Sequence, residues 1–81
     1  MKRLGTVLHK IDNLLIVHAD ITFEKSGLSQ RSIVITKKMK RIGTIKEMFG
    51  PSNNPYFSIQ LYKGISGSEL LELKNERVYL Q

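Results

Sequence analysis

RIGTIKEMFGPSNNPYFSI, residues 41–59, is the stretch of sequence that decides the fold. It predicts two short strands joined by a loop, because Gly50-Pro51 ends an apolar run and Asn54-Pro55 leads into an aromatic one. A proline fixes its own φ and disfavours helix in the residue before it, so two prolines restrict the loop to few conformations. A loop restricted in this way can present side chains to a partner, and it is the strongest functional indication in the sequence.

Two further segments predict a β-hairpin ahead of this stretch. Residues 4–10 and 14–20 are rich in Val, Ile, Leu and Thr, and the turn-forming pair Asp12-Asn13 lies between them. If Ile11 faces Leu14, one face of the hairpin carries Leu4, Leu8, Leu15, Val17 and Ala19, and the other carries Val7, His9, Ile11, Leu14, Ile16 and His18. A sheet with one wet face alternates more cleanly, so either this register is wrong or a partner protein covers the second face.

The rest of the chain predicts four more strands and very little helix. The β-branched residues of 31–36 favour a third strand, 42–48 a fourth, 56–62 a fifth with Phe57, Ile59 and Leu61 on one face, and 77–80 a sixth. Gly43 lies inside the fourth strand, where glycine is typical of a bulge or a sharp bend. A helical turn is expected near residues 68–74, with Ser68 as its N-cap and Glu72 nearby.

Six short strands favour an all-β fold, a small closed six-stranded barrel, because closure leaves no unpaired strand edge. The 81 residues predict a single domain, 1–81, with a thin core. The absence of Cys excludes disulfides and thiolate metal sites and fits a reducing compartment. The longest apolar run, residues 14–17, is too short to span a membrane, and no signal peptide precedes it, so we expect an intracellular protein with no membrane contact.

The formal net charge of +6 and a pI near 9.8 indicate contact with nucleic acid or a place in a ribonucleoprotein, because phosphate neutralisation supplies most non-specific affinity. The alternative is a basic surface that serves solubility alone. The densest basic run is Lys37, Lys38, Lys40 and Arg41, which precedes the fourth strand. These four side chains are candidate contacts for RNA phosphates, and a solvated loop is the other interpretation.

Two segments carry a resemblance to a known family. RLGTVLHK near the start and KRIGTIKEMFGPSNNPYFSIQL, with its Met48-Phe49-Gly50-Pro51 and Pro55-Tyr56-Phe57, are similar to the Gar-type subunit of box H/ACA ribonucleoprotein particles. This family also includes a eukaryotic nuclear assembly factor. The resemblance runs from about residue 4 to residue 80, and without Gly/Arg-rich tails the chain resembles a minimal archaeal form. It departs from the family pattern in residues 29–36.

The resemblance implies a six-stranded barrel related to a β-barrel domain of translation factors. It also implies a non-catalytic accessory subunit with no cofactor, which binds the dyskerin-like pseudouridine synthase subunit. The particle, with its guide RNA and other small proteins, converts uridines of ribosomal RNA to pseudouridine during ribosome biogenesis, and this subunit promotes loading and release of substrate RNA. Direct RNA contact is expected to be weak or indirect. The location implied is the cytoplasm of an archaeal cell, or the nucleolus if the chain is eukaryotic.

The resemblance also implies a synthase-docking site at the loop between the fourth and fifth strands. An aromatic residue beside a rigid Gly-Pro corner is a suitable preformed anchor, although Phe49 could instead belong to the core. The predicted docking residues are Ile45, Met48, Phe49, Gly50, Pro51, Pro55 and Tyr56.

Other candidate sites in the sequence are weaker. Tyr56 and Tyr62 could stack RNA bases, but core or interface positions explain them better. His9 and His18 fall on one face of the hairpin with Asp20 nearby, and we expect them to have structural or surface roles rather than to bind a metal or act in acid-base chemistry. The main alternative to the docking subunit is a stand-alone RNA-binding or translation-related barrel, and an enzyme is disfavoured because no nucleophile, base and orienting group come together.

Overall fold

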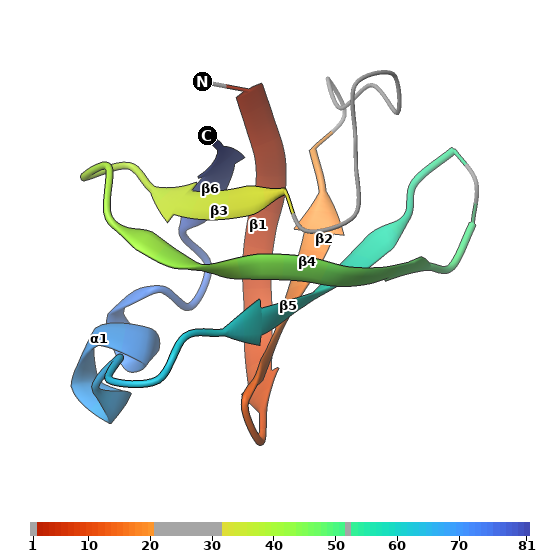
Figure 1. Ribbon diagram of the computed structural model, residues 1–81. Coiled ribbons are helices and arrows are strands. Elements are labelled where there is room, and N and C mark those ends of the chain that lie inside the picture. The colour runs from red at the N-terminus through yellow and green to blue at the C-terminus, as the bar shows by residue number, and fades with distance from the viewer. Residues whose placement is uncertain (1, 21–31, 52) are drawn as a thin grey trace.

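The hairpin, the fifth strand and the sixth strand all form where the sequence predicts them. The computed structural model describes residues 2–20, 32–51 and 53–81. Its elements are β1 (Lys2–Ile11), β2 (Leu14–Ala19), β3 (Ile33–Thr36), β4 (Arg41–Phe49), β5 (Tyr56–Leu61), α1 (Gly67–Glu72) and β6 (Arg77–Leu80), shown in Figure 1. Residue 31, the predicted start of the third strand, lies outside the described residues, and the fifth strand ends one residue before Tyr62.

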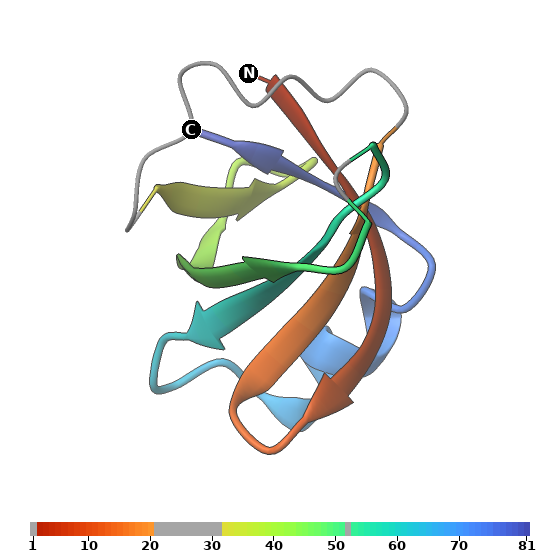
Figure 2. The ribbon, with the colours of Figure 1, turned by 90° about the vertical axis from the view of Figure 1, so that its right-hand side faces the viewer.

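The strands close into a barrel in the order β1-β2-β5-β4-β3-β6, and every neighbouring pair is antiparallel. The first and last strands meet at Lys2 and Leu80, which places the two ends of the chain on the same side of the barrel (Figures 1 and 2). The predicted six-stranded all-β barrel with one short helix is therefore confirmed. A single domain over residues 1–81 stays a prediction.

The core fills the barrel with alternate residues of β2, β5 and β6, whereas the core residues of β1 and of β4 are three positions apart. Its largest fully buried side chain is Phe57, and the cluster comprises Leu4, Val7, Leu15, Val17, Ala19, Val34, Ile42, Ile45, Phe57, Ile59, Leu61, Leu70, Val78 and Leu80. The prediction that Phe57, Ile59 and Leu61 share the inner face is confirmed. Leu70 of α1 belongs to the same cluster, so the helix covers one end of the barrel.

The predicted pairing of Ile11 with Leu14 is confirmed, but the register shifts by one residue at Leu8, and the predicted faces are therefore partly wrong. Ile11 pairs with Leu14, and the register shifts between Val7 and His9 because of a β-bulge at Leu8. A bulge adds one residue and reverses the alternation beyond it, so Val7 enters the core and Leu8 is only half buried. The sequence assigned the two residues to the opposite faces.

Gly43 lies at a bulge, one of the two features that a glycine within a strand predicts. The register between β3 and β4 shifts beside it, since Val34 pairs with Gly43 and Ile35 pairs with Arg41. A Cβ atom at Gly43 would lie 2.2 Å from the main-chain oxygen of Gln60 on β5. The close approach of two strand backbones at this bulge therefore requires glycine.

The N-cap of α1 is Ser66, so the prediction that Ser68 caps the helix is wrong. The Ser66 hydroxyl accepts a hydrogen bond from the Glu69 backbone N–H at 3.2 Å, and Ser66 has extended backbone angles. Ser68 lies inside the first turn, where its hydroxyl is 3.2 Å from that of Ser66. None of the helical residues in the described part of the chain forms a segment long and apolar enough to cross a membrane.

Candidate protein-binding site

Three aromatic rings form a row across β4, β5 and β2 on the outside of the barrel. The strand registers pair Phe49 with Tyr56 and Tyr56 with His18, and directly paired residues share one face of a sheet. The Phe49 and Tyr56 ring centroids are 5.7 Å apart, and those of Tyr56 and His18 are 4.6 Å apart, with interplanar angles of 17° and 19°. We call Phe49, Tyr56 and His18 the aromatic row.

The turn that follows β4, at Gly50 and Pro51, passes close to Tyr56 of the aromatic row. Gly50 has φ +90°, a conformation that side chains rarely adopt, and a Cβ atom there would lie 3.0 Å from Cδ1 of Tyr56. The chain then turns through Pro51, whose carbonyl accepts a hydrogen bond from the Asn54 backbone N–H at 3.1 Å. Glycine therefore allows the backbone both to turn and to pass close to the Tyr56 ring.

The apolar surface continues along β2 and β1 from the aromatic row. Ile16 pairs with Ser58 and Leu14 pairs with Gln60, so both isoleucine and leucine lie on the outer face beside β5. Both are only partly buried, and Ile11, opposite Leu14 on β1, is 49% exposed. The register shift at Leu8 moves Val7 from the predicted outer face into the core, but Ile11, Leu14 and Ile16 still leave the outer face of the hairpin apolar.

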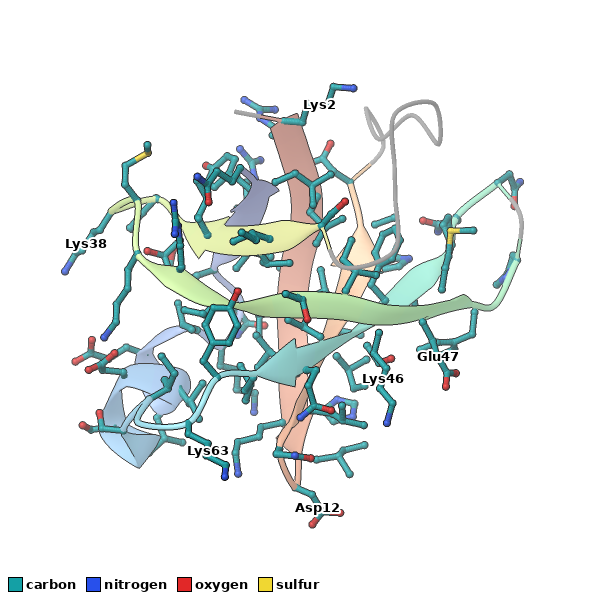
Figure 3. All side chains as sticks on the ribbon, viewed as in Figure 1. Lys2, Asp12, Lys38, Lys46, Glu47 and Lys63 are labelled. Carbon is teal, nitrogen blue, oxygen red and sulfur yellow. The ribbon has the colours of Figure 1, made fainter. Side chains whose placement is uncertain are left out.

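The structure places the predicted docking residues in two groups. Phe49 is 44% exposed and shares the outer face with the half-buried Tyr56, and Gly50 and Pro51 beside them are exposed. Met48 is 41% exposed but pairs with the core residue Phe57, so it lies on the opposite face of β4 (Figure 3 shows the neighbouring Lys46 and Glu47 at this end of β4). Ile45 points into the core, as Ile42 does three residues earlier, because the register shift between β3 and β4 leaves Ile42 as an extra residue in the strand. A surface that includes Ile45 is therefore not formed.

Pro55 also belongs to the scaffold rather than to the exposed surface. It is buried, and its carbonyl accepts a hydrogen bond from the Ala19 backbone N–H at 2.9 Å, which ties the loop to the end of β2. His18 and Ile16 complete the outer face. The sequence analysis placed both on the hairpin face that a partner could cover, although it did not count them among the docking residues.

The basic run forms the tip of the β3–β4 hairpin, where Met39 takes φ +68° and Thr36 Oγ1 accepts hydrogen bonds from two backbone N–H groups. Lys37 Nζ lies 3.3 Å from Glu76 Oε2, and Lys40 forms an ion pair with Glu69. These pairs span a groove of about 550 Å³ between the hairpin and α1. Two of the four predicted phosphate contacts are therefore engaged by carboxylates, and within the described residues Lys38 and Arg41 have no such partner.

The two histidines lie on the outer face of the hairpin but on different cross-strand rows. His18 pairs with Thr6, whereas His9 pairs with Ile16 and is exposed. Nε2 of His18 is buried without a hydrogen-bond partner in the part of the chain that the structure describes. In residues 2–20, 32–51 and 53–81 no three His, Asp or Glu side chains are grouped in a way that could hold a metal ion.

These features define a class, the small closed β-barrel domain that exposes an aromatic row beside a Gly-Pro corner. A family model described as the Gar1/Naf1 RNA binding region matches residues 1–81, and the chain belongs to this family. The resemblance read from the sequence is thus confirmed.

Two relatives and one solved structure support this assignment. The H/ACA ribonucleoprotein complex non-core subunit NAF1 of Saccharomyces cerevisiae is 34% identical over 58 residues, which are 72% of this chain and 12% of the yeast protein. A Methanothermobacter thermautotrophicus protein described as uncharacterized is 30% identical over 80 residues, 99% of this chain and 83% of that protein. The solved structure of the Gar1 domain of NAF1 superposes with a TM-score of 0.77 and 25% identity over 99% of this chain and 82% of that one.

Proposed function

We propose that this chain is a non-catalytic accessory subunit of an H/ACA ribonucleoprotein and that it binds the pseudouridine synthase subunit through the aromatic row and the Gly50-Pro51 corner. In this role it promotes loading and release of substrate RNA during guide-directed pseudouridylation of ribosomal RNA. The yeast relative is an H/ACA ribonucleoprotein complex subunit by name, and this chain spans about 12% of that protein's length. The particle, the synthase and the other small subunits are therefore the partners proposed for it.

The observation that carries the proposal is the exposure of Phe49. An aromatic side chain that is 44% exposed and stacked on Tyr56 is held in one orientation before any partner arrives. A preformed anchor of this kind loses little conformational entropy on binding, and buried aromatic anchors dominate the energetics of many interfaces. The partly exposed Ile16, Leu14 and Ile11 extend this surface to one side, as a partner covering the second face of the hairpin would require.

A pull-down of the tagged chain with an H/ACA-type pseudouridine synthase, without RNA and at raised salt, tests the docking. We expect Phe49→Ala to weaken binding at least about 30-fold, as truncation of a central aromatic anchor does. Leu71→Ala is the matched control, because Leu71 is 78% exposed on α1 and lies outside the proposed surface. Circular dichroism shows whether both variants are folded.

Two outcomes would contradict the proposal. One is equal binding by the wild type and a folded Phe49→Ala variant, and the other is equal weakening by Phe49→Ala and Leu71→Ala. An apolar interface tolerates moderate salt, whereas phosphate binding falls steeply as salt rises. If the wild type binds RNA alone in a salt-sensitive manner and does not bind the synthase, the stand-alone RNA-binding barrel is the correct function.

The second candidate function has one observation in its favour, the exposed basic hairpin with Lys38 and Arg41 outside any ion pair in the described residues. The engagement of Lys37 and Lys40 by Glu76 and Glu69 weakens it, since a phosphate there would have to displace a carboxylate. We therefore place docking first and expect this hairpin to add at most a weak contact to RNA.

A further inference from the structure

The groove between the β3–β4 hairpin and α1 has walls of opposite charge. Its volume is about 550 Å³, and Figure 1 shows the hairpin above α1 on the left of the barrel. The hairpin supplies the basic wall, and α1 with the residues that follow it supplies the acidic wall. The basic wall consists of Lys37, Lys38 and Lys40, and the acidic wall consists of Glu69, Glu72 and Glu76. We call this feature the two-walled groove.

The floor of the two-walled groove is apolar. Its lining includes Ile42, which belongs to the core, and Leu73, which packs against the core. The buried Thr36 also lines it, but the Thr36 hydroxyl already accepts hydrogen bonds from the backbone N–H groups of Lys38 and Lys40. Apolar contact gives a binding site affinity, and a few polar groups fix the orientation of the ligand. The groove has both components.

Two ion pairs join the walls, and both are weakly held. Lys37 Nζ lies 3.3 Å from Glu76 Oε2, and Lys40 pairs with Glu69. The four side chains are at least 42% exposed, so solvent and salt weaken their attraction and a ligand can take the place of either partner. Among residues 2–20, 32–51 and 53–81, Lys38 and Glu72 have no ion-pair partner. Each wall therefore has charge to offer to a ligand.

We propose that the two-walled groove binds an extended peptide segment in which acidic and basic residues alternate. Successive side chains of an extended strand point to opposite sides, so a Glu-Lys repeat carries its carboxylates along one edge and its ammonium groups along the other. Along the groove, the acidic edge faces the lysines of the hairpin and the basic edge faces the glutamates of the other wall. The methylene stems of the peptide side chains cover the apolar floor.

The two walls together disfavour a ligand whose charges all have one sign. A polyanion that contacts the hairpin lysines lies beside the glutamates of the acidic wall, and like charges brought together at an interface cost affinity. A polycation meets the same obstacle at the basic wall. An alternating segment places an opposite charge at each wall, so charge complementarity selects it over nucleic acid and over a purely acidic or basic peptide.

The two-walled groove is separate from the proposed docking site, so this inference goes beyond the proposed function. The β3–β4 hairpin leads into the start of β4 at Arg41, whereas the Gly50-Pro51 corner follows the end of β4 at Phe49. In Figure 1 the two ends of β4 lie on opposite sides of the barrel. One molecule can therefore hold the synthase at one end of β4 and the peptide segment at the other.

The first test is fluorescence anisotropy of two labelled eight-residue peptides titrated with the wild-type protein at low salt. One peptide repeats Glu-Lys, and the other has all its glutamates first and all its lysines after them, so their composition and net charge are equal. We expect the alternating peptide to bind at least about fivefold more tightly, the difference that one or two exposed ion pairs make. Its affinity should fall as salt rises, because the charges are exposed.

Exchanging the two partners of an ion pair tests the polarity of the walls. Lys40→Glu/Glu69→Lys keeps the net charge and the internal pair but reverses the polarity at one place, so an alternating peptide no longer matches both pairs. We expect it to bind the alternating peptide at least about fivefold more weakly. Adding Lys37→Glu/Glu76→Lys should restore the affinity to within about threefold, because the peptide then enters in the opposite chain direction.

The matched control is an exchange of charges outside the groove. Lys46→Glu/Glu47→Lys reverses two exposed residues near the far end of β4, labelled in Figure 3, and should bind the alternating peptide like the wild type. Circular dichroism shows whether the variants are folded. The comparison of the two peptides uses the wild type alone, so it tests the proposal even if a variant does not fold.

Four results would overturn the proposal: no binding of the alternating peptide by the wild type at low salt, equal binding of the two peptides, equal binding by the wild type and Lys40→Glu/Glu69→Lys, or complete displacement of the peptide by oligouridine at equal charge concentration. The last result would make the basic wall a phosphate site. The docking proposal is tested separately, because Lys40→Glu/Glu69→Lys should still bind the synthase and Phe49→Ala should still bind the alternating peptide.

Discussion

The Phe49 ring on β4 is stacked on the Tyr56 ring on β5, with centroids 5.7 Å apart and planes inclined by 17°. Because Phe49 is 44% exposed, this contact contributes little to stability beyond the stacking itself, about 1 kcal/mol. We expect Phe49→Ala to lower the free energy of unfolding by about 1 kcal/mol in urea titrations. Phe57→Ala, which removes a fully buried ring, should cost about 3–5 kcal/mol. Similar losses in both variants would mean that Phe49 is a core residue.

An alanine at Gly50 tests whether the turn after β4 positions the Tyr56 ring for docking, and an alanine at Gly64 is the matched control. The two residues have φ +90° and +91°, so alanine strains the backbone at both by about 1–2 kcal/mol. Only at Gly50 does the new Cβ meet the Tyr56 ring, whereas it meets nothing within 4 Å at Gly64. Gly50→Ala should therefore weaken synthase binding and Gly64→Ala should leave it unchanged. Equal affinities in the pull-down would show that the ring position does not matter for docking.

A substitution at Gly43 tests whether closure of the barrel requires the close approach of β4 and β5. An alanine there places a Cβ atom 2.2 Å from a main-chain oxygen of β5, and backbone cannot move away as a flexible side chain can. We expect Gly43→Ala to destabilise the fold by about 3 kcal/mol or more, the upper end of overpacking effects. Gly67→Ala, at the start of α1 with open space around it, should be neutral or stabilise by up to about 1 kcal/mol. Thermal unfolding followed by circular dichroism measures both.

Alanine substitutions at Ser66 and Ser68 distinguish the observed N-cap of α1 from the predicted one. Ser66→Ala removes the acceptor for the Glu69 backbone N–H and should cost about 1 kcal/mol, the usual value for an N-cap. Ser68→Ala should change the free energy of unfolding by less than about 0.5 kcal/mol. If Ser68→Ala lowered the free energy of unfolding in urea more than Ser66→Ala does, Ser68 would be the N-cap.

The ion pair between Lys37 and Glu76 should contribute little to stability. Its side chains are 61% and 44% exposed, so solvent and salt screen the attraction. A double-mutant cycle with Lys37→Met and Glu76→Gln should give a coupling energy below about 1 kcal/mol that shrinks in 1 M salt. A larger coupling that resists salt would show that the pair fixes the hairpin against the residues after α1.

Local patterns determined most of the fold. Alternation in residues 56–61, the turn pair Asp12-Asn13 and Gly43 each act over a few residues, so they placed the strands, the pairing of Ile11 with Leu14 and the bulge in β4. The prolines and Gly50 likewise located the corner and its aromatic neighbours, because turn chemistry depends on the residues of the turn itself.

Pairing between distant strands decided what the sequence could not. Because of the bulge at Leu8, Val7 lies in the core in place of Leu8. A bulge arises from the fit of the strands around the barrel and not from the pattern of any one strand. The strand registers also place Ile45 in the core, where a partner cannot contact it. They align Arg3, Tyr79 and Arg41 across β1, β6, β3 and β4. Residues this far apart in the chain meet only when the register of every intervening strand is set, which is a property of the tertiary structure.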